Sequence, residues 1–220
     1  MTVSGKRIYL YGVEQSGAPL ILVNTYDGDD GKSLYERIRE RATKPFTLAV
    51  ISGVDWNREL SPWEHPRIYK RDEDFTGGAN TYIMEIAEEI LPAIRKQLSG
   101  EPEYIAIAGY SLAGLFAIYS LYKTALFTRA VSASGSLWFP EFGNFLRQQT
   151  FAGDVDRVYF SLGERESHVK NPIVATVEDE TRRAFEHVRG QGVDTILEMN
   201  PGNHFTDDEL RLAKGIAWVL

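Results

Sequence analysis

The sequence predicts an α/β fold: a mostly parallel, doubly wound sheet with helices on both faces. From about residue 104 onward, short apolar runs of strand length alternate with longer segments whose apolar residues recur at helical spacing. Phe46–Ser52 is a continuous apolar run, which is typical of a parallel strand covered on both faces. Repeated strand–helix units of this kind form parallel sheets. The 220 residues contain no internal repeat or linker, so we expect a single domain over residues 1–220.

The N-terminal part of the chain contains two apolar runs, Ile8–Val13 and Leu20–Asn24, separated by a turn-forming segment with Gly17 and Pro19. This pattern predicts two strands joined as a hairpin. A short, charged helical pattern follows at Leu34–Arg41.

Val54–Asn80 is the least regular part of the sequence and is rich in Trp, Pro and Gly. A loop this long inside a compact domain is usually functional or mobile. Ala79–Leu98 then has apolar residues at helical spacing, and we expect Pro92 to kink this helix because proline lacks the main-chain N–H.

The second half of the chain alternates between the two kinds of pattern. Strands are expected at Tyr104–Ala108, Arg129–Ser134, Val158–Leu162 and Thr195–Met199. Helices are expected at Leu112–Lys123, Glu141–Gln149, Ile173–Arg189 and Asp207–Leu220.

Composition excludes several classes of protein. The chain has no cysteine, which rules out disulfides, thiolate catalysis and cysteine-ligated metal sites. It has only four histidines, which disfavours a three-histidine metal site. Its net charge of −7 disfavours binding to nucleic acid. No apolar run is long enough to span a membrane, and the first one is too short for a signal peptide. We therefore expect a soluble cytoplasmic protein without nucleic-acid or membrane partners; the sequence does not indicate an oligomeric state.

The sharpest local feature is Gly109-Tyr110-Ser111-Leu112-Ala113-Gly114, between a predicted strand and a predicted helix. A serine in this context can be the nucleophile of a strained strand–turn–helix elbow, which needs small residues around the serine. Ala113 replaces the second glycine of the usual pattern, and alanine is small enough for the turn. The alternative is a serine that only caps the N-terminus of a helix.

A nucleophilic serine needs a general base and an acid that orients this base. In hydrolases with such an elbow, the chain order is nucleophile, acid, histidine. His204 lies in a turn-rich loop after the last predicted strand, so it is the candidate base; a histidine in an ordinary polar loop is the alternative. Glu164 and Glu166 both follow the strand Val158–Leu162. We favour Glu166 because such acids often lie three residues after the glycine that ends the strand.

An oxyanion hole requires two N–H donors that are fixed before the reaction. The N–H of Leu112, directly after the serine, is one candidate. The second donor is expected just after the strand Leu20–Asn24, where the Tyr26 N–H is the first choice and the Thr25 N–H the next.

Several loop residues are candidates for contacting a substrate. Trp56, Trp63 and Trp138 would favour an aromatic or extended acyl group if they line the cleft, although aromatic loop residues are as often plugs of the core. Tyr110 and Arg58 complete the candidate substrate-binding set together with Trp138.

Two other motifs near strand ends are weaker. Tyr26–Ser33 nearly matches the motif of a phosphate-binding loop, but Tyr26 replaces the first glycine of that motif. The same segment lacks the glycine and the glutamate that a calcium-binding loop requires. Asp207 and Asp208 are expected to begin the last helix, where acidic residues favour the helix dipole, rather than to bind a metal. No metal or organic cofactor is implied.

Taken together, these motifs are similar to those of a known family. The segments concerned are Gly109–Gly114, Ser132–Phe139, Ser161–Glu166, Arg58–Pro62, Gly77-Gly78 and Gly202–Phe205. With them the chain, from about Pro19 to Leu220, resembles the putative esterase family of α/β-hydrolases. This family includes esterase D-like enzymes, siderophore esterases related to ferric enterobactin esterase, and mycolyltransferases.

The resemblance implies a single α/β-hydrolase domain without a separate lid domain, with Ser111 as nucleophile and His204 as base. The Gly-x-x-Glu pattern of related siderophore esterases supports Glu166 as the acid. The implied activity is the hydrolysis of a small-molecule carboxylic ester through an acyl-enzyme, without a cofactor. An acyltransferase with the same triad and a non-catalytic binding protein on the same scaffold are the alternatives. Simple acyl esters, sugar acetates and siderophore lactones all stay open as substrates.

Overall fold

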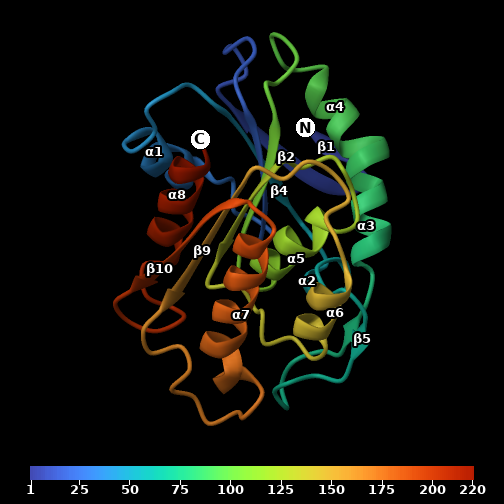
Figure 1. The fold of residues 1–220 in the computed structure, drawn as a ribbon. Coiled ribbons are helices and arrows are strands. Elements are labelled where there is room, and N and C mark those ends of the chain that lie inside the picture. Colours follow the sequence, from blue (N-terminus) through green and yellow to red (C-terminus); the bar gives the residue numbers. More distant parts are fainter.

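The computed structural model describes residues 1–220 and has one eight-stranded sheet at its centre (Figure 1). The strands lie in the order β1-β2-β4-β3-β7-β8-β9-β10. Their bounds are Thr2–Val3 (β1), Lys6–Tyr11 (β2), Leu20–Thr25 (β3), Thr47–Ser52 (β4), Ile105–Tyr110 (β7), Arg129–Ala133 (β8), Arg157–Gly163 (β9) and Asp194–Asn200 (β10). The last six of these run parallel, while β2 is antiparallel to β4 and β1 is antiparallel to β2. The mostly parallel sheet is thus confirmed.

Helices cover both faces of the sheet, as predicted (Figure 1). Two of them, α1 (Lys32–Arg39) and α8 (Asp208–Val219), pack together on one face. The opposite face carries α3 (Ala79–Glu85), α4 (Leu91–Arg95), α5 (Leu112–Leu121), α6 (Phe142–Gln148) and α7 (Val177–Gly190). No helix combines the length and the apolar character that crossing a bilayer requires.

The alternation of side chains along the strands divides the core into two layers. On β3, Leu20 and Leu22 join the core under α3 to α7, whereas Ile21 and Val23 join the core under α1 and α8. Successive side chains of a strand point to opposite faces, so a strand covered on both sides is apolar throughout. All six residues of β3 and all six of β4 are buried. This explains why the sequence shows these strands as continuous apolar runs.

The predicted hairpin between the first two long strands is wrong. β2 pairs with β4, with Arg7 opposite Ser52, and β3 lies on the other side of β4 and also pairs with β7. A strand buried on both faces gains most from an interior position with a neighbour on each edge. The Gly17–Pro19 turn therefore connects strands that are not adjacent. Turn residues show that the chain reverses, but not which strand becomes the neighbour.

The irregular segment Val54–Asn80 contains only short elements. These are α2 (Trp56–Glu59) and the two-stranded antiparallel pair β5 (Glu64–His65) and β6 (Phe75–Thr76). The segment begins after β4, where Trp56 stacks on Tyr26 after β3. It extends to the loops after β8 and β9, where Trp63 donates to the Pro140 carbonyl and Ile68 accepts from Asn171.

The long helix expected at Ala79–Leu98 is interrupted rather than simply kinked. A π-helical turn at Ile86–Ile90 separates α3 from α4, and Pro92 follows within the first turn of α4. Proline has no N–H for the hydrogen bond to the preceding turn, and a widened turn accommodates this loss.

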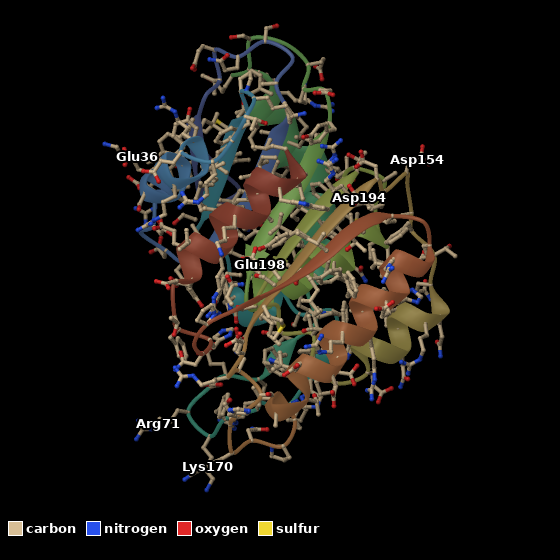
Figure 2. All side chains as sticks on the ribbon, turned by 60° about the vertical axis from the view of Figure 1, so that its left-hand side comes forward. Glu36, Arg71, Asp154, Lys170, Asp194 and Glu198 are labelled. Carbon is tan, nitrogen blue, oxygen red and sulfur yellow. The ribbon has the colours of Figure 1, made fainter.

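The loops at the carboxyl ends of the parallel strands lie together at the lower end of Figure 2. There, Arg71 and Lys170 project into solvent from two different loops, and the Asn171 side chain joins these loops by donating to the Ile68 carbonyl at 3.0 Å. Asp194, which begins β10, lies toward the other end of the molecule. The direction of the strands therefore gathers their carboxyl-end loops around one site.

Candidate active site

Ser111 lies in a strained turn between β7 and α5, with φ 58° and ψ −122°. Positive φ is rare for residues other than glycine and marks a backbone held by its surroundings. The Ser136 N–H donates to the Ser111 carbonyl at 2.9 Å. A Cβ atom at Gly109 would lie 2.3 Å from the carbonyl oxygen of Ala113, so the turn closes only with glycine there. Local sequence thus produces a half-buried serine at the start of a helix.

The structure brings Ser111, His204 and Glu166 together. His204 Nε2 lies 3.1 Å from Ser111 Oγ, and His204 Nδ1 lies 2.8 Å from Glu166 Oε2. Glu166 is 4% exposed, whereas the His204 side chain is 31% exposed. In the neutral imidazole, this geometry assigns the proton to Nδ1, facing the carboxylate, and leaves the Nε2 lone pair facing the serine hydroxyl.

Glu164 lies outside this arrangement. It is exposed, and its main-chain N–H donates to the Asn200 carbonyl at 2.8 Å, which ties the loop after β9 to the end of β10. Glu166, two residues later, turns inward to His204. The remaining histidines form no hydrogen bond with Ser111 or Glu166; they are His65, His168 and His187.

Four donors surround the Glu166 carboxylate. Oε2 faces His204, and Oε1 accepts from the Gly163 N–H at 2.7 Å, the Ser134 hydroxyl at 2.7 Å and Arg211 Nη1 at 2.9 Å. Burial alone would raise the pKa of Glu166, but the hydrogen bonds from His204 and Ser134 outweigh it and hold this pKa below the ordinary value of 4.5. Glu166 is therefore an ionised acceptor at neutral pH.

Arg211 and Ser134 are site residues that the sequence analysis missed. Arg211 comes from α8, is 1% exposed, and also donates to the Pro201 carbonyl at 2.8 Å. Ser134 follows β8 with a left-handed φ of 46°, and its hydroxyl bonds to Glu166. The sequence carries no local signal for Arg211, because its burial on α8, and with it the need for a charged or polar partner, follows only from the fold.

Tyr110 links the serine turn to the loop that carries His204. Its hydroxyl donates to the His204 carbonyl at 2.6 Å. Burial raises the pKa of Tyr110 to about 12, so the hydroxyl keeps its proton at neutral pH. The side chain thus holds the main chain of His204 in place.

Both candidate oxyanion donors lie at the carboxyl ends of adjacent strands. Leu112 is the first residue of α5, so its N–H has no partner within the helix. Tyr26 follows β3, and its N–H is not used by another group of the chain. The Tyr26 ring is 61% exposed and stacks on Trp56 with a centroid distance of 4.2 Å.

A cavity of about 330 Å³ lies beside this edge, between the loop after β3 and the start of α8. The aromatic side chains of Tyr26, Trp56 and Tyr110 line it together with Asp208 and Glu209. A larger cavity of about 420 Å³ lies between α6 and α7 and includes none of the residues around Ser111. Of these two cavities, only the smaller one is lined by Tyr110, the residue before Ser111; Ser111, His204 and Glu166 do not line it.

The other candidate substrate-binding residues have partners within the chain. The Arg58 guanidinium pairs with Asp55 at 3.2 Å and with Glu59 at 3.1 Å. Trp63 packs edge-on against aromatic rings of the core, so its role is to fill space within the core. Trp138 is half-buried in the turn after β8. Neither Arg58 nor Trp138 forms a hydrogen bond with the side chains around Ser111.

The acidic segment after β3 uses its carboxylates to close its own turn. Asp29 accepts from the Thr25 hydroxyl at 2.6 Å and from the Gly31 N–H at 2.9 Å. No group of three or more His, Asp or Glu side chains is arranged to hold a metal ion. Asp207 and Asp208 lie at the start of α8, as predicted.

Comparisons with known proteins identify the family of this chain. Residues 22–207 match the family model described as Putative esterase. The uncharacterized protein YbbA of Bacillus subtilis (strain 168) is 25% identical in an alignment 214 residues long that covers 92% of this chain and 79% of that protein.

Solved structures show the same fold. An IroE-like serine hydrolase from Shewanella oneidensis has a TM-score of 0.78 at 17% identity, covering 97% of this chain and 74% of that one. The enterobactin esterase FES from Shigella flexneri, solved in the presence of enterobactin, has a TM-score of 0.71 at 18% identity, covering 97% of this chain and 54% of that one. The sheet of this chain is the α/β-hydrolase sheet. Because the family model matches most of its length, the chain belongs to the Putative esterase family and is a carboxylic ester hydrolase.

Proposed function

We propose that the chain hydrolyses small-molecule esters through an acyl-enzyme on Ser111, with His204 as general base and acid and with Glu166 orienting His204. The observation that best supports this proposal is the continuous line from Ser111 Oγ through both ring nitrogens of His204 to Glu166, with steps of 3.1 and 2.8 Å. Both distances suit hydrogen bonds: a proton can pass along the first, from Ser111 Oγ to His204, while the second orients the imidazole without proton transfer to Glu166.

The first half of the reaction forms the acyl-enzyme. Ser111 Oγ attacks the ester carbonyl carbon while His204 Nε2 takes the hydroxyl proton, and the carbonyl electron pair moves to oxygen. The oxyanion collapses, the bond to the leaving oxygen breaks, and His204 returns its proton to the departing alcohol. Glu166 stays ionised throughout, because it accepts the Nδ1–H bond and stabilises the imidazolium without taking its proton.

The second half releases the acid. Water attacks the acyl-Ser111 carbonyl while His204 takes a proton from the water, and collapse of the second oxyanion breaks the bond to Ser111 Oγ. His204 returns the proton to the serine, so the enzyme is regenerated and one carboxylic acid is released. The N–H groups of Leu112 and Tyr26 are the donors we assign to both oxyanions.

The substrate is a small-molecule ester, and the cavity that Tyr110 lines is the space we assign to part of it, since Tyr110 directly precedes Ser111. Its aromatic residues Tyr26 and Trp56 suit a flat or extended group. Since a structure of the similar enterobactin esterase was solved with enterobactin, a catecholate lactone belongs in the test panel beside simple esters.

The direct test is hydrolysis of p-nitrophenyl acetate, p-nitrophenyl butyrate and enterobactin by the wild type and by Ser111→Ala. The proposal requires Ser111→Ala to lose turnover of every ester that the wild type cleaves. Ser120→Ala is the matched control, because Ser120 lies on the same helix and its hydroxyl only bonds the Phe116 carbonyl. Unchanged turnover in Ser111→Ala would refute the proposal, and transfer of the acyl group to an added alcohol in preference to water would indicate an acyltransferase.

A further inference from the structure

Arg211 is a buried guanidinium that contacts four separate segments at the carboxyl edge of the sheet. Nη1 donates to Glu166 Oε1 at 2.9 Å and to the Ser134 hydroxyl at 3.1 Å, and lies 3.4 Å from the Tyr110 hydroxyl. Nη2 donates to the Pro201 carbonyl at 2.8 Å. These partners belong to the loop after β9, the end of β8, the serine turn after β7 and the loop after β10.

Stability alone does not account for a charge at this position. Arg211 is 1% exposed, and its Nε has no hydrogen-bond partner, so the guanidinium is incompletely compensated for the water it has lost. A buried ion pair often contributes no more stability than well-packed apolar side chains of similar volume. The role of Arg211 is better explained by the effect of its charge and of its planar guanidinium group on the neighbouring loops.

Gly163 leaves the space that this guanidinium fills. A Cβ atom at Gly163 would lie 2.9 Å from both Nη1 and Nη2 of Arg211 and 2.8 Å from the Gly202 carbonyl oxygen. The Gly163 N–H also donates to Glu166 Oε1 at 2.7 Å. The strand end, the acid and the guanidinium are therefore packed directly against one another.

We propose that Arg211 is a positioning residue for ester hydrolysis: it holds Glu166 as a charged acceptor and anchors the loop that presents His204 to Ser111. This inference rests on the proposed function. Arg211 is buried and is not among the residues that line the cavity beside the site. The chemical step should therefore depend on it, whereas substrate binding should not.

The first part of this role is electrostatic. A carboxyl group that is 4% exposed favours its protonated form unless a cation or hydrogen bonds offset the burial. A protonated Glu166 could donate a hydrogen bond to His204 instead of accepting one. The guanidinium opposes this, so that His204 keeps its proton on Nδ1. The other titratable and charged groups around this site are Tyr110 from β7, Tyr159 from β9, on which the charge of Arg211 also acts, and Asp208 at the start of α8, whose charge acts on Tyr110.

The second part is geometric. Pro201 precedes His204 by three residues, and Arg211 holds its carbonyl while Tyr110 holds the carbonyl of His204. The loop is thus fixed on both sides of the turn that aims the imidazole. A lysine would keep the charge, but it lacks the planar fork that reaches Glu166 and Pro201 together.

The test compares Arg211→Met and Arg211→Lys with the matched control Arg129→Met. Arg129 is also largely buried, with 14% of its side chain exposed, and pairs with Asp156 at 2.8 Å near the amino end of β8. It also donates to the Val219 carbonyl, far from the site. Melting temperature is measured for each protein, and kcat and KM for p-nitrophenyl butyrate are measured across pH.

Arg211→Met is expected to lower kcat on the order of 10²-fold with little change in KM, because the imidazole loses its fixed position. The acidic limb of its pH profile should move to higher pH, because the pKa of Glu166 rises when the cation is lost. Arg211→Lys should restore the position of this limb while kcat stays clearly below the wild-type value. Arg129→Met should lower the melting temperature with kcat and the pH profile unchanged.

Wild-type kcat in Arg211→Lys would overturn the proposal, and this holds whether or not Arg211→Met folds. A folded Arg211→Met protein that has a raised KM at wild-type kcat would overturn it as well. A wild type without esterase activity would instead refute the proposed function, so the two failures are distinct.

Discussion

Two buried clusters of charged side chains lie at the carboxyl edge of the sheet. They differ in what their central carboxylate binds besides its cation. In the first, Arg211 pairs with Glu166 at 2.9 Å, and the second oxygen of that carboxylate accepts from the imidazole of His204 at 2.8 Å. In the second, Lys6 pairs with Glu59 at 3.0 Å and with Glu85 at 2.7 Å.

The second cluster holds main chain rather than a reactive side chain. The other oxygen of Glu59 accepts from the Asp55 N–H at 2.9 Å, which fixes the start of α2. Lys6 is 4% exposed and joins this helix to β2 and, through Glu85, to α3. Burial of an ion pair therefore does not distinguish a catalytic site from an architectural contact. The distinction lies in the group bound by the second carboxylate oxygen, which is the imidazole of His204 at Glu166 and the main-chain N–H of Asp55 at Glu59.

The largest expected difference between the clusters comes from replacing their carboxylates. Glu166→Gln should lower kcat by about 10⁴-fold, because an amide cannot hold the productive tautomer of His204. Glu59→Gln should leave kcat within a few-fold of the wild type while it lowers stability. Steady-state kinetics and urea unfolding of both variants check this. Equal losses of kcat in the two variants would show that the clusters do not differ as described.

Removing the cation of the second cluster should affect folding only. Lys6→Met leaves Glu59 and the partly exposed Glu85 without their shared cation, and we expect a loss of about 3 kcal/mol in the free energy of unfolding. Urea unfolding measures this loss, and active-site titration corrects kcat for the folded fraction. A corrected kcat that falls as far as in Glu166→Gln would contradict a purely architectural role.

A smaller effect separates the half-buried Tyr110 from the buried Tyr82. Tyr110→Phe removes the donor to the His204 carbonyl, and the loss of about 1 kcal/mol for one hydrogen bond corresponds to a decrease in kcat of roughly 5-fold. Tyr82 is the matched control, since its hydroxyl donates to Asn24 Oδ1 at 2.6 Å. Tyr82→Phe should lower stability by a similar amount and leave kcat unchanged. The comparison is made by kinetics and thermal unfolding of both proteins.

The smallest expected effect is on acid stability. The folded-state pKa of Glu166 lies below 4.5, so its ionisation stabilises the fold above the unfolded value and this contribution is lost as the pH falls through the folded value. Between about pH 5 and pH 3, the wild type should therefore lose more unfolding free energy than Glu166→Gln. Parallel slopes for the two proteins in urea unfolding across this range would remove Glu166 from the account of acid stability.

The sequence was most informative where a feature is local. Hydrophobic periodicity and apolar runs located the interior strands, because a strand buried on both faces is apolar along most of its length, as in the run from Leu48 to Ile51 within β4. It failed where pairing depends on distant segments. The insertion of β4 between β2 and β3 has no local signal, and Thr2–Val3 is too short to show any periodicity.

The same distinction applies to the site. The turn around Ser111 is specified by its own small residues, so the local pattern located it. His204 and Glu166 were inferred from their order in the chain, and two glutamates after β9 fitted that order until the structure showed which one turns inward. Arg211 was missed because nothing near it in the sequence indicates that its partner is a carboxylate 45 residues away.

The central claim, a covalent acyl-enzyme on Ser111, is tested most directly by rapid-quench mass spectrometry with p-nitrophenyl butyrate. The account predicts that a butyryl group appears on the peptide containing Ser111 within the first turnover of the wild type and never on Ser111→Ala. Turnover by the wild type without that adduct, or turnover that persists in Ser111→Ala, would contradict it.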